Sequence, residues 1–355
     1  MSPLERFLFT MTVMFSGFTY PLICGIYFKT LLRKRYEIQK LLQGRFMEKY
    51  TQAYGGISVD DLFNMYHNWK DYLFPVVLNA SVVSCVTAAL MLKVSDHITL
   101  GSSPLSLFTK LPYSAAAGFI GAYIFSHYDM IRRFSTMDLT STIIYRLWLR
   151  LLVGGMLGYL VGFFLQPQFQ MITAFCLGAF PVNKLRDLMK QMVQKKMGVS
   201  QETAMAEKPN LYKLQGFTEE MIDRLEEEGI RTTQHLAFAN PVLLLLKTNL
   251  QWTVILDMIG QAILYIFIGD KVEEHRPLGI RSAIDFAKVH YLMSDPDENK
   301  REVGGQLADL IGTKLGQDRI GTYNLIQSVS ENPQVRFICE LWQETCEEVR
   351  IYKPR

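Results

Sequence analysis

The chain has 355 residues, a net charge of +3, and 49% hydrophobic residues. This length leaves room for a membrane part and one further domain, at about 100–200 residues per domain. Residues 1–200 hold 20 Lys and Arg against 10 Asp and Glu, whereas residues 201–355 hold 17 against 24. The acidic second half lacks the positive field that attracts nucleic acid, so we expect no double-stranded DNA partner. The cysteine spacings predict neither disulfides nor a metal site.

The first apolar segment covers residues 7–32 and is long enough to cross a bilayer. The basic run at residues 33–35 follows at once, which places this end in the cytoplasm and the N-terminus outside. Apolar residues recur every four positions over residues 38–50, so the first helix continues out of the bilayer or lies along it. Ser58, with Asp61 three residues later, predicts a capping box that starts the next helix.

The second and third spans are expected at residues 73–92 and 111–128. The third has a face of small residues that includes Gly118 and Gly121. Polar side chains within a span face protein or water rather than lipid. Those of the second span are therefore pore-lining candidates, with hydrogen bonding to a neighbouring helix as the alternative. They are Asn79, Ser81, Ser84 and Thr87.

The fourth and fifth spans, residues 147–165 and 169–182, form a hairpin around a Gln-Pro-Gln turn. Three glycines of the fourth span fall four residues apart and let another backbone approach closely. They pack within their own subunit, or they line a subunit interface or pore. They are Gly154, Gly158 and Gly162. The short fifth span either extends with Lys184 and Arg186 snorkelling or is a half-length pore-type segment.

The basic residues support this five-span topology. Lys and Arg number 7, 3 and 5 in the inner segments 33–72, 129–146 and 183–196, against 1, 2 and 0 in the outer segments 1–6, 93–110 and 166–168. We predict an all-α fold with a membrane domain in residues 1–196, a linker in 197–208 and a cytoplasmic helical domain in 209–355. Polar residues interrupt the apolar stretch 242–269, which we interpret as two buried soluble helices.

The cytoplasmic domain opens with a patterned stretch, LYKLQGFTEEMIDRLEEEGIRTTQHLAFANPVLLLL, at residues 211–246. Gly216 is free to take a tight turn between helices, Thr218 can cap the next helix, and Gly229 can end it. The pattern over residues 211–268 resembles helix-hairpin-helix domains of the SAM-like superfold. In such domains, hairpin glycines offer backbone amides to phosphate.

The second hairpin departs from that family pattern. Asn249 stands where the second glycine would be, and residues 226–228 are three glutamates. Protein docking or oligomerisation is one interpretation, and recognition of a nucleotide or short oligonucleotide is the other. The ligand or partner-binding candidates are Lys213, Gly216, Phe217, Thr218, Arg231, Lys247 and Asn249.

No catalytic, metal-binding or cofactor motif stands out. The sequence lacks GxxxxGK[ST], HExxH and GxSxG. Asp295, Asp297 and Asn299 mimic the opening of a calcium loop, but Lys300 replaces its glycine. We interpret that segment as a capping loop, and expect no enzyme, metal or cofactor.

Small-residue faces, polar residues within spans and the lack of an inverted repeat favour a homo-oligomeric pore or channel, gated by its cytoplasmic domain. The layout resembles bacterial antiviral membrane effectors, and Hailong-type transmembrane effectors in particular. That resemblance implies an ion channel in the inner membrane of a bacterium, held closed by a short oligonucleotide. The alternative is a non-conducting membrane adaptor, whose spans only anchor a protein-docking module.

Overall fold

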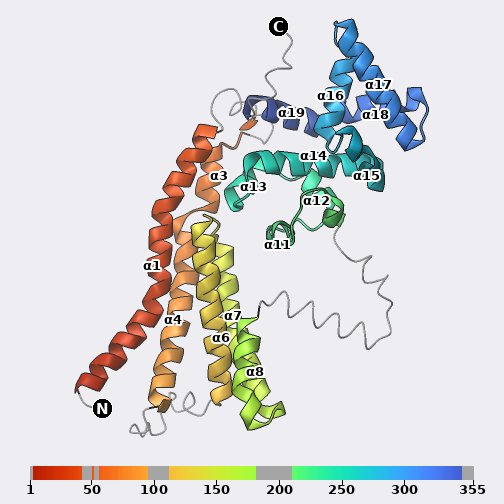
Figure 1. The fold of residues 1–355 in the computed structure, drawn as a ribbon. Helices are drawn as coiled ribbons and strands as arrows, with labels where there is room; N and C mark the ends of the chain where they lie inside the picture. Colours follow the sequence, from red (N-terminus) through yellow and green to blue (C-terminus); the bar gives the residue numbers. More distant parts are fainter. Residues whose placement is uncertain (1–2, 42–49, 52–55, 95–111, 181–209, 346–355) are drawn as a thin grey trace. The chain divides into compact units, whose positions relative to one another are not determined.

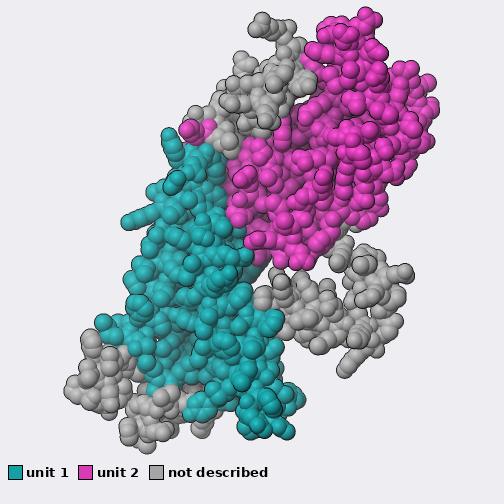
Figure 2. Space-filling view, in the orientation of Figure 1, with its two compact units in different colours: residues 1–38, 63–200 teal, residues 39–62, 201–355 magenta. Residues whose placement is uncertain are grey.

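The computed structural model describes residues 3–41, 50–51, 56–94, 112–180 and 210–345, and these residues form helices and turns with no strand (Figure 1). The all-helical prediction is therefore confirmed for this part of the chain. The chain divides into two compact units (Figure 2). The first comprises residues 1–38 and 63–200, and the second comprises residues 39–62 and 201–355. The predicted linker, residues 197–208, lies outside the described residues.

The first unit is a bundle of helices. They are α1 (Pro3–Leu41), α3 (Val59–Tyr66), α4 (Trp69–Val94), α6 (Tyr113–Ser135), α7 (Ser141–Phe164) and α8 (Pro167–Ala179). Residues 39–41 of α1 and 59–62 of α3 are grouped with the second unit. Helix α6 packs on α7 and α8, and α4 packs on α7. Ser84 of α4 donates to the carbonyl oxygen of Val13 at 3.4 Å, which joins α4 to α1.

Local chemistry sets where these helices begin and continue. The predicted capping box is confirmed, because the backbone N–H of Asp61 donates to Ser58 Oγ at 3.0 Å and that of Ser58 donates to the Asp61 carboxylate at 3.4 Å. Helix α3 accordingly begins at Val59. The first helix runs on past its predicted span to Leu41, with Pro21 inside it.

Four of the described helical stretches are long and apolar enough to cross a membrane, which indicates a membrane protein. They are Thr10–Lys40, Val59–Met91, Ser141–Phe164 and Trp252–Leu278. The first three overlap most of the first, second and fourth predicted spans, and 22–28% of their most apolar windows is buried. For Trp252–Leu278 that share is 56%, because the helix packs among others of the second unit.

The third and fifth predicted spans fall on helices of a different kind. Helix α6 is not among these four stretches, and it carries His127, Asp129, Arg132 and Arg133 in its second half. Helix α8 has 13 residues, so it is about 20 Å long, whereas the hydrocarbon core of a bilayer is about 30 Å thick. The described part of the fifth span is thus too short to cross alone, and the count of five spans stays a prediction.

The second unit is built around α14. Its helices are η1 (Asn210–Lys213), α11 (Glu219–Glu227), α12 (Thr233–Ala237), α13 (Pro241–Lys247), α14 (Trp252–Ile268), η2 (Gly269–Lys271), α15 (Val272–His275), η3 (Arg276–Leu278), α16 (Ala283–Met293), α17 (Glu298–Leu315), α18 (Arg319–Glu331) and α19 (Pro333–Thr345). Helix α14 contacts α12, α13, α16 and α19. The apolar stretch 242–269 divides into α13 and α14, as expected from its polar interruption.

Residues 39–62 join this second unit, although the sequence places them in the membrane domain. Tyr50 is completely buried there, and its hydroxyl accepts a hydrogen bond of 2.8 Å from the side-chain amide of Asn240. The second unit is thus assembled from two separate parts of the chain.

Candidate functional site

Glycines bring α6 and α7 into backbone contact. A Cβ atom at Gly154 would lie 2.6 Å from the Cβ of Ala122 and 2.9 Å from the carbonyl oxygen of Gly118. A Cβ atom at Gly158 would lie 3.1 Å from the Cα of Ala115. Interiors this closely packed have no room for an added methyl group. The structure thus places both predicted interface glycines against α6 of their own chain.

Helix α8 joins the same close contact from another side. A Cβ atom at Gly178 would overlap the carbonyl oxygen of Gly118, and one at Gly121 would lie 3.0 Å from the backbone nitrogen of Ala179. Gly162, the third predicted glycine, lies beside Ser114 of α6. Small residues are the usual means by which membrane helices pack closely. Together α6, α7 and α8 form one tightly packed group.

Two neighbouring glycines of α7 provide a matched test of this packing. Gly158→Ala should lower the free energy of unfolding by about 1–3 kcal/mol, because its methyl group meets the α6 backbone. Gly155→Ala should be neutral or stabilising by up to about 1 kcal/mol, because a Cβ atom there meets no described atom within 4 Å. Detergent-solubilised full-length protein, unfolded by increasing SDS and followed by circular dichroism, measures both. Equal effects of the two substitutions would contradict the packing described.

Arg150 is the charged residue at the centre of this group. Its side chain comes from α7, is 8% exposed and stacks on the ring of Phe125, with 3.7 Å between the guanidinium carbon and the ring centroid. Its Nη2 donates to the carbonyl oxygens of Gly178 at 3.3 Å and Ala179 at 2.9 Å, and also to that of Phe180. These are the carbonyl groups that a helix end leaves without a partner. Arg150 therefore caps the C-terminus of α8.

This cap lies well inside the bundle rather than at its edge. Arg150 is the tenth residue of the 24 in α7, about 14 Å from the start of that helix. Within a bilayer, unpaired backbone groups are tolerated only where protein buries them or where they line a water-filled cavity. The guanidinium supplies the partners that the short α8 needs at that depth.

The predicted polar candidates of α4 are not brought together. Asn79 is completely buried and donates to the carbonyl oxygens of Pro75 at 2.8 Å and Ile144 at 3.1 Å, which ties α4 to α7. Ser84 faces α1 as described above, Ser81 is exposed, and Thr87 is half-buried. Asn79 and Ser84 thus make the inter-helix bonds that the sequence left as an alternative, and a pore-lining role stays a prediction.

A second polar contact in the first unit links α6 to α1. The Nε2 atom of His127 lies 2.8 Å from Thr19 Oγ1, and its Nδ1 lies 3.1 Å from the carbonyl oxygen of Tyr123. The imidazole also packs edge-on against the ring of Tyr20, with centroids 4.7 Å apart. His127 is thereby held by two side chains of α1 and by a backbone carbonyl of its own helix, α6.

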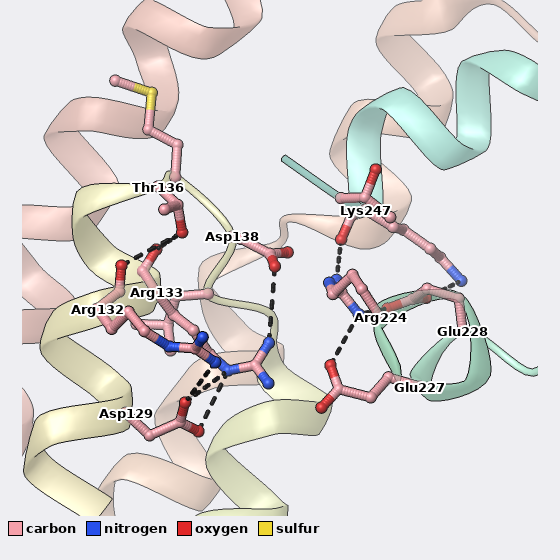
Figure 3. Close-up of polar contacts among 12 residues, drawn as sticks. Asp129, Arg132, Arg133, Thr136, Asp138, Arg224, Glu227, Glu228 and Lys247 are labelled. Carbon is pink, nitrogen blue, oxygen red and sulfur yellow. Dashed lines mark hydrogen bonds and ion pairs between the residues drawn. The ribbon is translucent and has the colours of Figure 1, made fainter. Parts of the chain in front are cut away.

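A charged cluster closes the turn between α6 and α7 (Figure 3). Arg133 lies 3.2 Å from Asp129 and 3.6 Å from Asp138, and its side chain is only 10% exposed. Arg132 reaches Asp129 at 3.3 Å from a more exposed position. The ammonium of Lys34 on α1 donates to the carbonyl oxygen of Met137 at 3.0 Å. The turn is therefore fixed by paired charges, which suits the polar end of a membrane helix pair.

The first hairpin of the second unit has the local form that the sequence predicts. Gly216 and Gly229 have φ angles of 81° and 86°, in the left-handed region that favours glycine. The backbone N–H of Met221 donates to Thr218 Oγ1 at 3.3 Å, which caps α11. The backbone N–H of Gln215 donates to Gln261 Oε1 at 2.8 Å, so this hairpin amide is already bonded within the unit.

The basic candidates of this region have different surroundings. Lys213 donates to both carboxylate oxygens of Asp270, at 2.7 and 2.9 Å, and this bond, helped by the hydroxyl of Tyr265, raises the pKa of Lys213 above its ordinary value. Arg231 is exposed, and Phe217 is half-buried. The Lys213 charge is thus balanced within the chain.

The second hairpin is held by a buried arginine (Figure 3). Arg224 of α11 is 6% exposed and donates to Glu227 at 3.1 Å, to Glu228 at 2.7 Å and to the carbonyl oxygen of Lys247. The ammonium of Lys247 lies 3.5 Å from Glu228. The three-glutamate run therefore supports this hairpin, while Asn249 is exposed beside it.

The segment that mimics a calcium loop is a capping loop, as predicted. Asp297 accepts from the backbone N–H of Asn299 at 3.0 Å and so caps α17. The ammonium of Lys300 lies 3.4 Å from Asp295. Within the described residues, no group of His, Cys, Asp and Glu could hold a metal ion.

Comparison of the chain with known protein families, curated proteins and solved structures finds no match.

Proposed function

We propose that this chain is the subunit of a homo-oligomeric membrane pore or ion channel, gated by its second unit. The observation that carries the proposal is Arg150, which caps a 13-residue helix at depth within the bundle. A charged side chain at mid-bilayer costs about 2.5–3.5 kcal/mol on insertion scales and marks functional paths in membrane proteins. Helices that end within the bilayer occur beside ion and substrate sites. A simple anchor has no use for either feature.

For the arrangement in the membrane, the proposal keeps the topology expected from the sequence. In that topology five spans place the N-terminus outside and the second unit in the cytoplasm, with α8 forming the first part of the fifth span. A helix-hairpin-helix-like module over residues 211–268 would sense a ligand or hold subunits together. Because Lys213 and Lys247 are both ion-paired within the chain, protein docking is favoured over phosphate binding at that module. An antiviral effector of the bacterial inner membrane remains the class that the layout resembles.

Electrical recording tests the proposal. Full-length protein in planar bilayers should conduct little, and protein ended after Lys196 should conduct at least several-fold more, because the restraint is removed. Arg150→Leu in the shortened protein should change its conductance. Arg132→Leu should leave the conductance unchanged, because Arg132 is 46% exposed and pairs with Asp129. Membrane insertion of every form is checked by flotation. Inserted forms that are all silent and harmless to cells would refute the channel.

A non-conducting adaptor is the second candidate, and one observation favours it. Asn79 and Ser84, two of the four polar candidates of α4, bond neighbouring helices of their own chain rather than a lumen. Single-particle images of the detergent-purified protein discriminate the two functions. Rotational symmetry around a lumen supports the channel, and a particle without a lumen supports the adaptor.

A further inference from the structure

An apolar cavity of about 600 Å³ lies between α4, α6 and α7. Ala115, Phe119 and Leu151 line it and are all less than 9% exposed, so they form its inner end. The other described residues around it are also apolar, with Tyr159 the one that carries a hydroxyl. The cavity is separate from the Arg150 cap, because none of that residue's partners lines it.

One glycine shows that α7 leaves this space open. Gly155 lines the cavity, and a Cβ atom there would meet no described atom within 4 Å. Its neighbours Gly154 and Gly158 have no such room, because they press against α6. Ala89 and Ala116 reduce the side-chain volume on the facing helices in the same way. Glycine in α7 therefore serves two purposes, close packing on one side and an open cavity on the other.

The cavity opens sideways from the bundle. Met156 and Leu160 line it and are 64% and 49% exposed, so they form its rim. Its α4 and α7 residues, 82–90 and 151–160, lie in the middle and end of helices that begin at Trp69 and Ser141. Its α6 residues lie near the start of that helix. The lining residues of all three helices thus place the cavity in one half of the bundle. In a bilayer, this part of the helices would lie in the hydrocarbon core.

Water is a poor occupant of such a space, since a buried water needs two to four polar partners. We propose that the cavity binds the acyl chain of a membrane phospholipid, which enters between the rim residues. Its volume falls within the range of about 300–1,000 Å³ for small-molecule sites. An apolar lining without charge matches an alkyl chain rather than a headgroup. The proposal rests on the chain crossing a bilayer and is independent of whether it conducts.

Photolabelling tests this directly. Full-length protein is reconstituted in phosphatidylcholine vesicles that contain phosphatidylcholine with a diazirine in its acyl chain, then irradiated, digested and mapped by mass spectrometry. Label should concentrate several-fold on Ala116, Gly155 and their neighbours over other exposed residues of the bundle. Gly155→Trp should fill the cavity and reduce that label several-fold, and Gly155→Ala should keep it. The matched control is Leu149→Trp, which adds an indole at a position 55% exposed outside the cavity.

Two results would overturn the proposal. One is label spread evenly over all exposed apolar positions and unchanged by Gly155→Trp, which means ordinary surrounding lipid. The other is efficient disulfide formation between two copies carrying Met156→Cys with no lipid label at the cavity, which means a protein interface. Ala116→Phe fills the same cavity from α6 and serves if Gly155→Trp does not fold, as judged by circular dichroism. Photolabelling does not depend on ion conduction, so its result can be interpreted even if the protein is not a channel.

Discussion

Arg224→Met should lower the free energy of unfolding of the second unit by about 3–5 kcal/mol. The guanidinium is 6% exposed and holds Glu227, Glu228 and the carbonyl oxygen of Lys247 at once. The side chains of both glutamates are under 15% exposed. Removing one partner from a buried charge cluster leaves the others without compensation, which costs more than the bonds contributed. Methionine keeps the apolar stem of the side chain, so the loss reports the charge.

Amide hydrogen exchange in the full-length protein measures this loss where it should occur. Exchange in α13 and α14 should accelerate, because the hairpin between them loses its cap. Lys213→Met is the control, since it also removes a cation but from an exposed pair with Asp270, and it should change little. If Arg224→Met protects α13 and α14 as well as the wild type does, the buried cluster contributes nothing to the hairpin.

Local signals in the sequence predict much of this fold. The Ser58–Asp61 box, the Thr218 cap and the glycine turns at residues 216 and 229 are all confirmed, because each depends on residues within a few positions of one another. The division of the stretch 242–269 into two helices is confirmed for the same reason. Such features can be predicted without knowing how the helices pack against one another.

Contacts between distant segments escape that kind of reasoning. The sequence places Gly154 in the glycine stripe that packs closely, but it gives no sign that Gly155 beside it borders a cavity. Likewise, the Tyr50–Asn240 bond joins residues 190 positions apart, so the sequence did not assign residues 39–62 to the second unit. Arg150 did carry a signal, as a charge inside an apolar span. Its partners on α8, about thirty residues away, could be identified only from the fold.

Arg150→Leu should destabilise the first unit by about 3 kcal/mol, because three carbonyl groups at the end of α8 lose their donor. Each unsatisfied buried polar group costs about 1–3 kcal/mol, and removal of the buried charge offsets part of the sum. The stacking on Phe125 is lost as well. The stability of Arg150→Lys should lie between that of the wild type and that of Arg150→Leu, since an ammonium keeps the charge but lacks the planar fork of the guanidinium.

SDS unfolding of the full-length protein, followed by circular dichroism, measures the loss of stability. Amide hydrogen exchange shows which helix is destabilised. Exchange should rise in α8, whose terminal carbonyls are released, while α1 should stay protected. Arg132→Leu is the matched control, because this arginine is 46% exposed and its partner Asp129 keeps Arg133, so the loss should be under about 1 kcal/mol. An Arg150→Leu protein as stable as the wild type, with α8 still protected, would mean that water or another donor reaches these carbonyls. Water at that depth would itself point to a hydrated path through the bundle, so stability and conductance of this one variant should be measured together.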